Sequence, residues 1–143
     1  MVKRKECLAY EYGEWRFEWY VNEGGNSPAL EYYHEKLDED QKTALAALFD
    51  YLAICYSSGK SPNKEKISPE GDALFAFKPK PHRFLAFFVK GKTVIITHGF
   101  EKKRNKLPAN EKKKAETYRS DYELRTIRGN YYDEETKGVH KPT

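Results

Sequence analysis

The chain has 143 residues and a formal net charge of +4, with 38% hydrophobic and 15% aromatic residues. This length and apolar content suit one domain with a single core. Its two cysteines, Cys7 and Cys55, exclude a disulfide framework and a cysteine-based zinc site. The sequence has no run long enough to cross a membrane and no apolar signal region in MVKRKECLAY, so we expect a reduced, cytoplasmic location without a membrane partner.

The first half of the chain predicts one strand and two helices. Residues 15–21 alternate apolar and polar side chains, which predicts a half-buried strand. After the loop 22–26, Ser27 and Pro28 suit the N-cap and first turn of a helix that reaches about Leu37. Asp38 caps a second helix to about Tyr56, because apolar residues recur there at helical spacing.

The second half predicts three strands and a final helix. We expect the polar segment 57–72 to be a loop, followed by strands at residues 73–77, 83–89 and 93–100. Two prolines interrupt the chain after the first of these strands, since proline cannot donate to a sheet. Gly91 suits a tight hairpin turn between the last two strands, and Pro108 begins a helix to about Arg125.

These elements follow the order β-α-α-β-β-β-α. The order predicts a compact α+β domain, with an antiparallel meander sheet and helices packed on one face. We expect residues 1–128 to form this single domain, and residues 129–143 to be a polar, flexible tail.

Charge is distributed unevenly along the chain. Residues 1–40 carry ten acidic and five basic side chains, whereas residues 78–106 carry nine Lys and Arg and a single acid, Glu101. A local excess of cations on a balanced protein is typical of a domain that binds a polyanion. The alternative is a solvated charged surface without a partner.

Several kinds of catalytic site are excluded by the sequence. It has no glycine-rich phosphate loop, no serine in a nucleophile elbow, and no histidines at metal-binding spacing. We therefore expect no metal and no cofactor. His98, inside a strand, is interpreted as a hydrogen-bonded structural residue.

Two basic segments at strand ends remain as the candidate site. In a hairpin that turns at Gly91, Arg83 lies opposite residues near Phe100, so the two segments meet at one end of the sheet. Clustered cations can hold a nucleic-acid backbone or stabilise the charge that develops in phosphoryl transfer. The predicted patch comprises Lys78, Lys80, His82, Arg83, Lys102, Lys103, Arg104 and Lys106.

The last predicted helix adds further candidates. Ala115, Tyr118 and Tyr122 share one face, and Arg119 precedes Tyr122 by three residues. Tyr118 is interpreted as a packing residue. Tyr122 lies nearer to the helix end, where it could reach the basic patch or stack on a base.

The strand ending in HGFEKKRNKLP and the helix closing on RSDY resemble the RelE superfamily of toxins, and within it the phage-derived HigB-like branch. In that branch a hydrophobic strand ends in His-Gly-Phe-x-Lys-Lys, followed by a proline and a Glu-rich helix that ends near a tyrosine. The segment FEWYVNEGGNSPALEYYHEKLDED resembles its strand, polar loop and helix, so the likeness spans residues 15–124. One departure is LFAFK at residues 74–78, where the branch has Trp/Leu-Glu-Leu-Arg.

The resemblance implies a type II toxin that acts as a ribosome-dependent mRNA endonuclease, with mRNA on the ribosome and a cognate helix-turn-helix antitoxin as partners. Toxin and antitoxin could assemble into a hetero-oligomer. The RNA 2′-hydroxyl would attack the adjacent phosphate without a metal.

The same resemblance assigns roles by position. Arg83 and Lys102 would stabilise the phosphorane, Lys80 or His82 would act as the base, and Tyr122 would stack on a base or assist proton transfer. RNA contacts would come from Lys78, Lys103, Arg104, Lys106 and Arg119.

Two other hypotheses remain open at the level of sequence. One is a non-catalytic RNA- or ribosome-binding domain on the same fold, in which single cations contribute affinity in small steps. The other is a phage-derived protein-interaction module whose acidic N-terminal half docks a partner.

Overall fold

The computed structural model describes residues 1–103 and 106–133. The predicted α+β fold class is confirmed, but the sequence patterns missed three elements: α1, β1 and β3. β3 was expected to be loop because its sequence, Ile67-Ser-Pro-Glu-Gly71, contains proline and glycine. In chain order the elements are α1 (Arg4–Cys7), β1 (Leu8–Tyr12), β2 (Trp15–Trp19), α2 (Pro28–Lys36), α3 (Glu39–Ser57), β3 (Ile67–Gly71), β4 (Leu74–Phe77), β5 (His82–Val89), β6 (Thr93–Glu101) and α4 (Ala109–Ile127).

All these strands belong to one six-stranded sheet, in the order β1-β2-β6-β5-β4-β3. Neighbouring strands are antiparallel except β2 and β6, which run parallel. The β4-β5-β6 part is the antiparallel meander that the sequence predicts. β6 lies inside the sheet between β2 and β5, which explains why its residues Thr93 to His98 are all buried.

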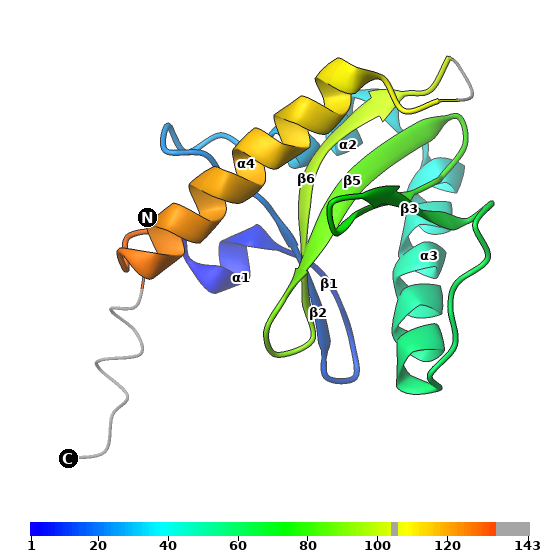
Figure 1. Ribbon diagram of the computed structural model, residues 1–143, viewed down its shortest axis with the longest axis horizontal. Coiled ribbons are helices and arrows are strands. Elements are labelled where there is room, and N and C mark those ends of the chain that lie inside the picture. Colours follow the sequence, from blue (N-terminus) through cyan, green and yellow to red (C-terminus); the bar gives the residue numbers. More distant parts are fainter. Residues whose placement is uncertain (104–105, 134–143) are drawn as a thin grey trace.

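The helices cover both faces of the sheet, and the expectation that they pack on one face is therefore corrected. Helices α2 and α3 pack with Phe17, Phe77 and Phe84 in one hydrophobic cluster. Helix α4 packs with Leu85 and Ile95 in a second cluster on the opposite face. Figure 1 shows α4 and α3 on either side of the strands. Successive side chains of β5 point to opposite faces of the sheet, and from Phe84 to Phe87 they are apolar and buried on both faces. Both faces therefore need a cover.

The predicted helix starts of α2 and α3 are confirmed. The hydroxyl of Ser27 accepts from the backbone N–H of Leu30 at 3.3 Å, and Pro28 occupies the first turn. Asp38 forms a capping box with Gln41: each side chain accepts from the backbone N–H of the other residue, at 2.8 and 2.9 Å. These caps fix where α2 and α3 begin against the sheet.

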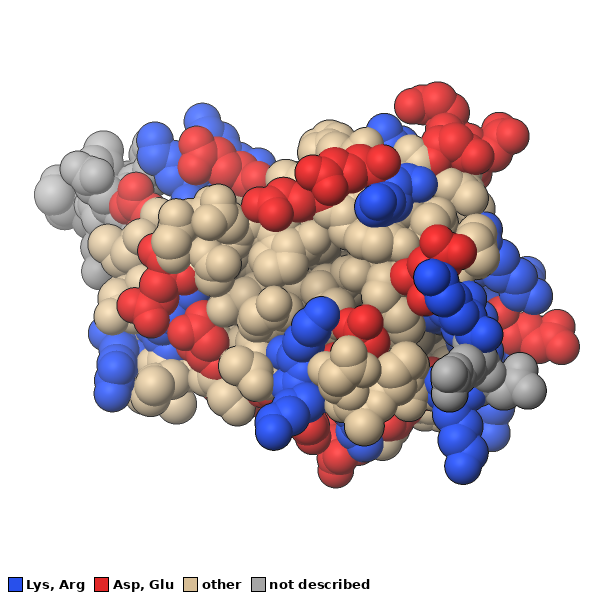
Figure 2. All heavy atoms as spheres, turned by 90° about the horizontal axis from the view of Figure 1, so that it is seen from above, with Lys and Arg blue, Asp and Glu red and all other residues tan. Residues whose placement is uncertain are grey.

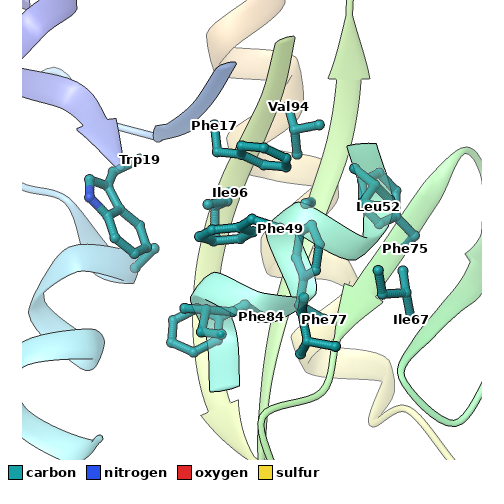
Figure 3. Packing of buried hydrophobic residues seen from close by; sticks show 14 of the residues in the cluster. Phe17, Trp19, Phe49, Leu52, Ile67, Phe75, Phe77, Phe84, Val94 and Ile96 are labelled. Atoms are coloured by element: carbon teal, nitrogen blue, oxygen red, sulfur yellow. The ribbon is translucent and has the colours of Figure 1, made fainter. Parts of the chain in front are cut away.

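Aromatic side chains fill the core under α3 (Figure 3). Phe17 of β2 stacks on Phe49 of α3 with ring centroids 4.5 Å apart, and Phe77 of β4 meets the same ring edge-on at 4.9 Å. Such ring pairs add to the stabilisation from burial alone. This core holds β2, β4 and α3 as one unit.

A β-bulge at Thr97 decides which face the end of β6 presents. Leu85 of β5 lies opposite His98, but the next residue, Ala86, lies opposite Ile96. The extra residue reverses the alternation, as bulges do. His98 and Phe100 therefore face α4, together with Leu85. Without the bulge they would face α2.

The packed part of the chain continues beyond the expected domain boundary at Arg128. Tyr131 and Tyr132 are buried in the cluster under α4, and Val2 donates its backbone N–H to the carbonyl of Tyr131 at 2.8 Å. Two residues of the predicted tail thus belong to the core. Residues 134–143 of that tail lie outside the described residues.

Candidate functional site

The pairing of β5 with β6 brings the two basic segments together, as the sequence predicts. Arg83 lies opposite Phe100, and His82 lies opposite Glu101. The contact continues past the strand end, where the backbone N–H of Lys102 donates to the carbonyl of Pro81 at 3.0 Å. The junction before β5 and the segment after β6 are therefore held side by side.

A small cleft of about 50 Å³ lies at this junction, beside the start of α4. We call it the cation cleft. Its lining includes four cations, and one carboxylate faces them from β3. The lining residues are Glu70, Ala76, Lys78, Arg83, Phe100, Lys102, Lys106, Leu107 and Pro108.

Arg83 is the most enclosed cation of the cleft, with 9% of its surface exposed. Its Nη1 donates to the backbone carbonyl of His82 at 2.9 Å, which holds the guanidinium in place. Burial lowers the pKa of this group, while the charge of Glu70 acts in the opposite direction. An arginine stays cationic at physiological pH, so Arg83 presents a fixed positive charge.

Lys78 lies half-buried at the end of β4, and its Nζ donates to the carbonyl of Lys64 at 2.8 Å. Burial lowers the pKa of the Lys78 ammonium, and the charges of Arg83, Lys102 and Lys80 lower it further. These effects mark a site where positive charge is concentrated and partly removed from water.

The other predicted cations differ in their access to the cleft. Lys102 is half-buried and Lys106 is exposed, and both line it. Lys103 and Lys80 are exposed and lie outside the lining. Arg104 lies outside the described residues. Figure 2 shows basic and acidic side chains interspersed over the face that it draws, so this face is not a uniform basic surface.

His82 points to the opposite face of the sheet from Arg83, as neighbours in a strand do. Its Nδ1 lies 2.7 Å from the hydroxyl of Tyr32 in α2, and its Nε2 lies 3.3 Å from Gln41 Oε1 in α3. Burial lowers the pKa of this imidazole. The structure therefore places His82 between α2 and α3, away from the cation cleft.

Tyr122 and Arg119 also lie away from the cleft. Pro108, which precedes α4, lines the cleft, and Tyr122 lies about 20 Å further along this helix. The Tyr122 hydroxyl lies 2.7 Å from that of Tyr132, and burial raises the pKa of Tyr122 to about 12. Arg119 donates to the carbonyl of Asp72 in the β3–β4 turn.

His98 is hydrogen-bonded on both ring nitrogens. Its Nδ1 lies 3.0 Å from the Thr97 hydroxyl, and its Nε2 lies 3.1 Å from Glu111 Oε1 on α4. Burial lowers the pKa of the imidazole despite the neighbouring carboxylate. This geometry agrees with the structural role inferred from the sequence, since His98 joins β6 to the first turns of α4.

None of the helices in residues 1–103 and 106–133 is long and apolar enough to cross a membrane. Within the same part of the chain, no three His, Cys, Asp or Glu side chains gather as a metal site would require.

Residues 33–120 match the family model described as Phage derived protein Gp49-like (DUF891). The chain belongs to this family. The Gp49-like family is part of the RelE/HigB-like toxins of toxin–antitoxin systems, which implies a partner antitoxin in general. The chain matches no curated protein.

The Gp49-like match contains every residue that lines the cation cleft. It ends before Tyr122 and begins after β1 and β2. The cation cleft therefore lies wholly within the family-matched region.

Glu70 is the cleft residue that sequence reasoning missed. It lies in the segment expected to be a loop, and the proline and glycine on either side of it hide the strand. Alternation after the buried Ile67 would have placed Ser68 on the other face. It does not place Glu70, because the register shifts between Pro69 and Gly71.

Proposed function

We propose that the protein is a type II toxin of the HigB-like branch that cleaves mRNA on the ribosome. It acts in the cytoplasm and is neutralised by a cognate helix-turn-helix antitoxin. The proposal is supported chiefly by the cation cleft, in which four cations converge beside a strand junction within the family-matched region.

The cleft suits a phosphate whose charge increases during the reaction. When the 2′-hydroxyl attacks, the phosphorus gains an extra negatively charged substituent, and preorganised cations stabilise this state more than the ground state. Arg83 and Lys102 are assigned this role. Lys78 and Lys106 hold the flanking backbone within the cleft.

The test compares an Arg83→Ala/Lys102→Ala variant with the wild type, both induced in cells without antitoxin. The wild type is expected to arrest growth and leave translated mRNAs cut with 5′-hydroxyl ends. The variant is expected to lose at least 100-fold in cleavage, since one such donor is worth about 10²–10³ in rate. Growth, mapped transcript ends and the melting temperature of each purified protein are measured.

A matched control removes two cations elsewhere. Lys60 and Lys90 are exposed and do not line the cleft. Lys60→Ala/Lys90→Ala should arrest growth like the wild type. A wild type that neither slows growth nor cuts translated mRNA would exclude the enzyme. Cleavage that falls only in proportion to RNA affinity would favour a non-catalytic RNA-binding domain.

A further inference from the structure

We propose that Glu70 is the general base of the cleavage reaction and accepts the proton of the attacking RNA 2′-hydroxyl. This assignment rests on the endonuclease function proposed above. Among the described residues that line the cation cleft, Glu70 is the one carboxylate.

Strand pairing places Glu70 with the cations. Ser68 of β3 lies opposite Ala76 of β4, and the register shifts between Pro69 and Gly71, so that Glu70 is the extra residue of a bulge. The hydrogen bond between Ser68 and Glu70, and the presence of Glu70 and Ala76 in one cleft lining, place the Glu70 side chain on the side of Ser68 and Ala76. The backbone N–H of Lys78 donates to the carbonyl of Lys66, which continues this pairing to the end of β4. Glu70 thus reaches the cleft from the edge strand, opposite the segment that carries Lys102.

The carboxylate is held at one oxygen and open at the other. The Ser68 hydroxyl donates to Glu70 Oε2 at 2.5 Å. Oε1 makes no hydrogen bond or ion pair with any side chain in residues 1–103 and 106–133, and Glu70 is only half-buried. A base needs this arrangement, because one oxygen fixes its position while the other has a lone pair for the incoming proton.

Cations surround this carboxylate on several elements. Lys78 just after β4, Arg83 of β5, and Lys102 and Lys106 after β6 line the same cleft. The charge of Glu70 also acts on Lys112 of α4. A glutamate is ionised at neutral pH and can accept a proton directly, whereas a lysine must first lose one. The cations meanwhile bring the RNA phosphate next to it.

The bases suggested by sequence are less well placed. His82 lies on the other face of the sheet with both ring nitrogens near a hydrogen-bond partner. Lys80 is exposed and does not line the cleft. Glu70, by contrast, lines the same cleft as the cations that are proposed to bind the phosphate.

The proposed step balances as follows. The 2′-O–H bond breaks and its proton passes to Glu70 Oε1, while the 2′-oxygen forms a bond to phosphorus. The P–O5′ bond breaks, and the 5′-oxygen takes a proton from water. Glu70 then returns its proton to water, which leaves a 2′,3′-cyclic phosphate and a 5′-hydroxyl.

The experiment uses purified full-length wild type, Glu70→Gln and Glu70→Asp with ribosomes programmed with a short mRNA. Single-turnover cleavage rates are measured from pH 5 to 9, and affinity is measured on the same complexes. We expect Glu70→Gln to cleave about 10²–10⁴-fold more slowly, the usual contribution of a general base. Its affinity should be equal or tighter, because a negative charge leaves the cleft. We expect the wild-type rate to fall at low pH; this fall should be absent in Glu70→Gln, and Glu70→Asp should regain part of the rate.

Glu65→Gln is the matched control, since Glu65 is exposed in the turn before β3 and lies outside the cleft lining. It should cleave like the wild type. If Glu70→Gln keeps the wild-type rate, or loses rate with an unchanged pH profile, the assignment of Glu70 is overturned while the endonuclease stands. If the wild type itself does not cleave, both proposals are overturned. Equal melting temperatures show that a lost rate is not lost folding.

Discussion

At the scale of single residues, Glu18 shows how this fold handles a charge inside its core. It lies on β2, and its side chain is only 1% exposed. Its carboxylate accepts from the Tyr132 hydroxyl at 2.6 Å and from Arg16 Nε at 2.5 Å, and the Cys7 thiol lies 3.6 Å away. Burial, and next the charge of Glu18, raise the pKa of Cys7 to about 12, so the thiol stays protonated and can donate. The charge is thereby fully paired.

Replacing Glu18 with alanine should strongly destabilise the protein. The change removes the carboxylate that accepts from Arg16 Nε and from the Tyr132 hydroxyl, and breaking such a buried pair costs about 3–5 kcal/mol. Glu18→Gln should cost less because its amide oxygen still accepts a hydrogen bond. Glu11→Ala is the control, since this carboxylate is 60% exposed and lies 3.7 Å from the same arginine; it should cost less than about 1 kcal/mol. Urea denaturation measures all three, and an equal cost for Glu11 and Glu18 would contradict the argument.

At the scale of elements, the sequence predicted the features that depend on neighbouring residues, such as the starts of helices. Ser27 and Asp38 cap α2 and α3 through their own side chains, so their positions were visible in the sequence. The bulge at Thr97 was not, because the apolar run of β6 reads alike in either register. That bulge turns His98 and Phe100 toward α4, and Phe100 thereby comes to line the cation cleft. Strand alternation separates His82 from Arg83, and it was missed because β5 begins at His82, one residue before the expected start at Arg83.

Gly99 shows why the His-Gly-Phe segment of β6 needs its glycine. A β-carbon at this position would lie 2.5 Å from Tyr32 Cδ1 and 2.9 Å from Phe84 Cε2. Glycine therefore lets α2 pack directly on β6, and lets Tyr32 reach the ring of His82. The requirement comes from close packing, since the backbone of Gly99 is outside the left-handed region.

Gly99→Ala should destabilise the fold by about 1–3 kcal/mol, the usual cost of overpacking a core. Tyr32 would have to move, so the contact between α2 and β6 should loosen before the rest of the sheet. Gly24→Ala is the control, because the nearest atom to its β-carbon would be Asn22 Oδ1 at 3.4 Å. Denaturant unfolding and hydrogen exchange of α2 measure the effect. Equal stability of the two variants would show that α2 can shift without cost.

At the scale of the whole molecule, positive charge is concentrated in the cation cleft and not spread over one face. The net charge is only +4, and acidic and basic side chains alternate over the surface seen in Figure 2. Four cations nevertheless meet in the cleft, and they come from β5 and from the segments that follow β4 and β6. Such a protein should have little long-range attraction for RNA. Its affinity should come from a small number of direct phosphate contacts.

The salt dependence of RNA binding tests this arrangement. Each phosphate contact on a single strand contributes about −0.7 to the slope of log K against log salt, so the four cleft cations predict a slope of about −3. A 2′-O-methylated RNA, which cannot be cleaved, is titrated at several salt concentrations. Lys106→Ala should reduce the slope by about 0.7, because Lys106 lines the cleft, whereas the exposed Lys60→Ala should leave it unchanged. A slope near −6 that both variants lower equally would mean that RNA is held by diffuse charge over the whole surface, and the cleft would lose its special role in binding.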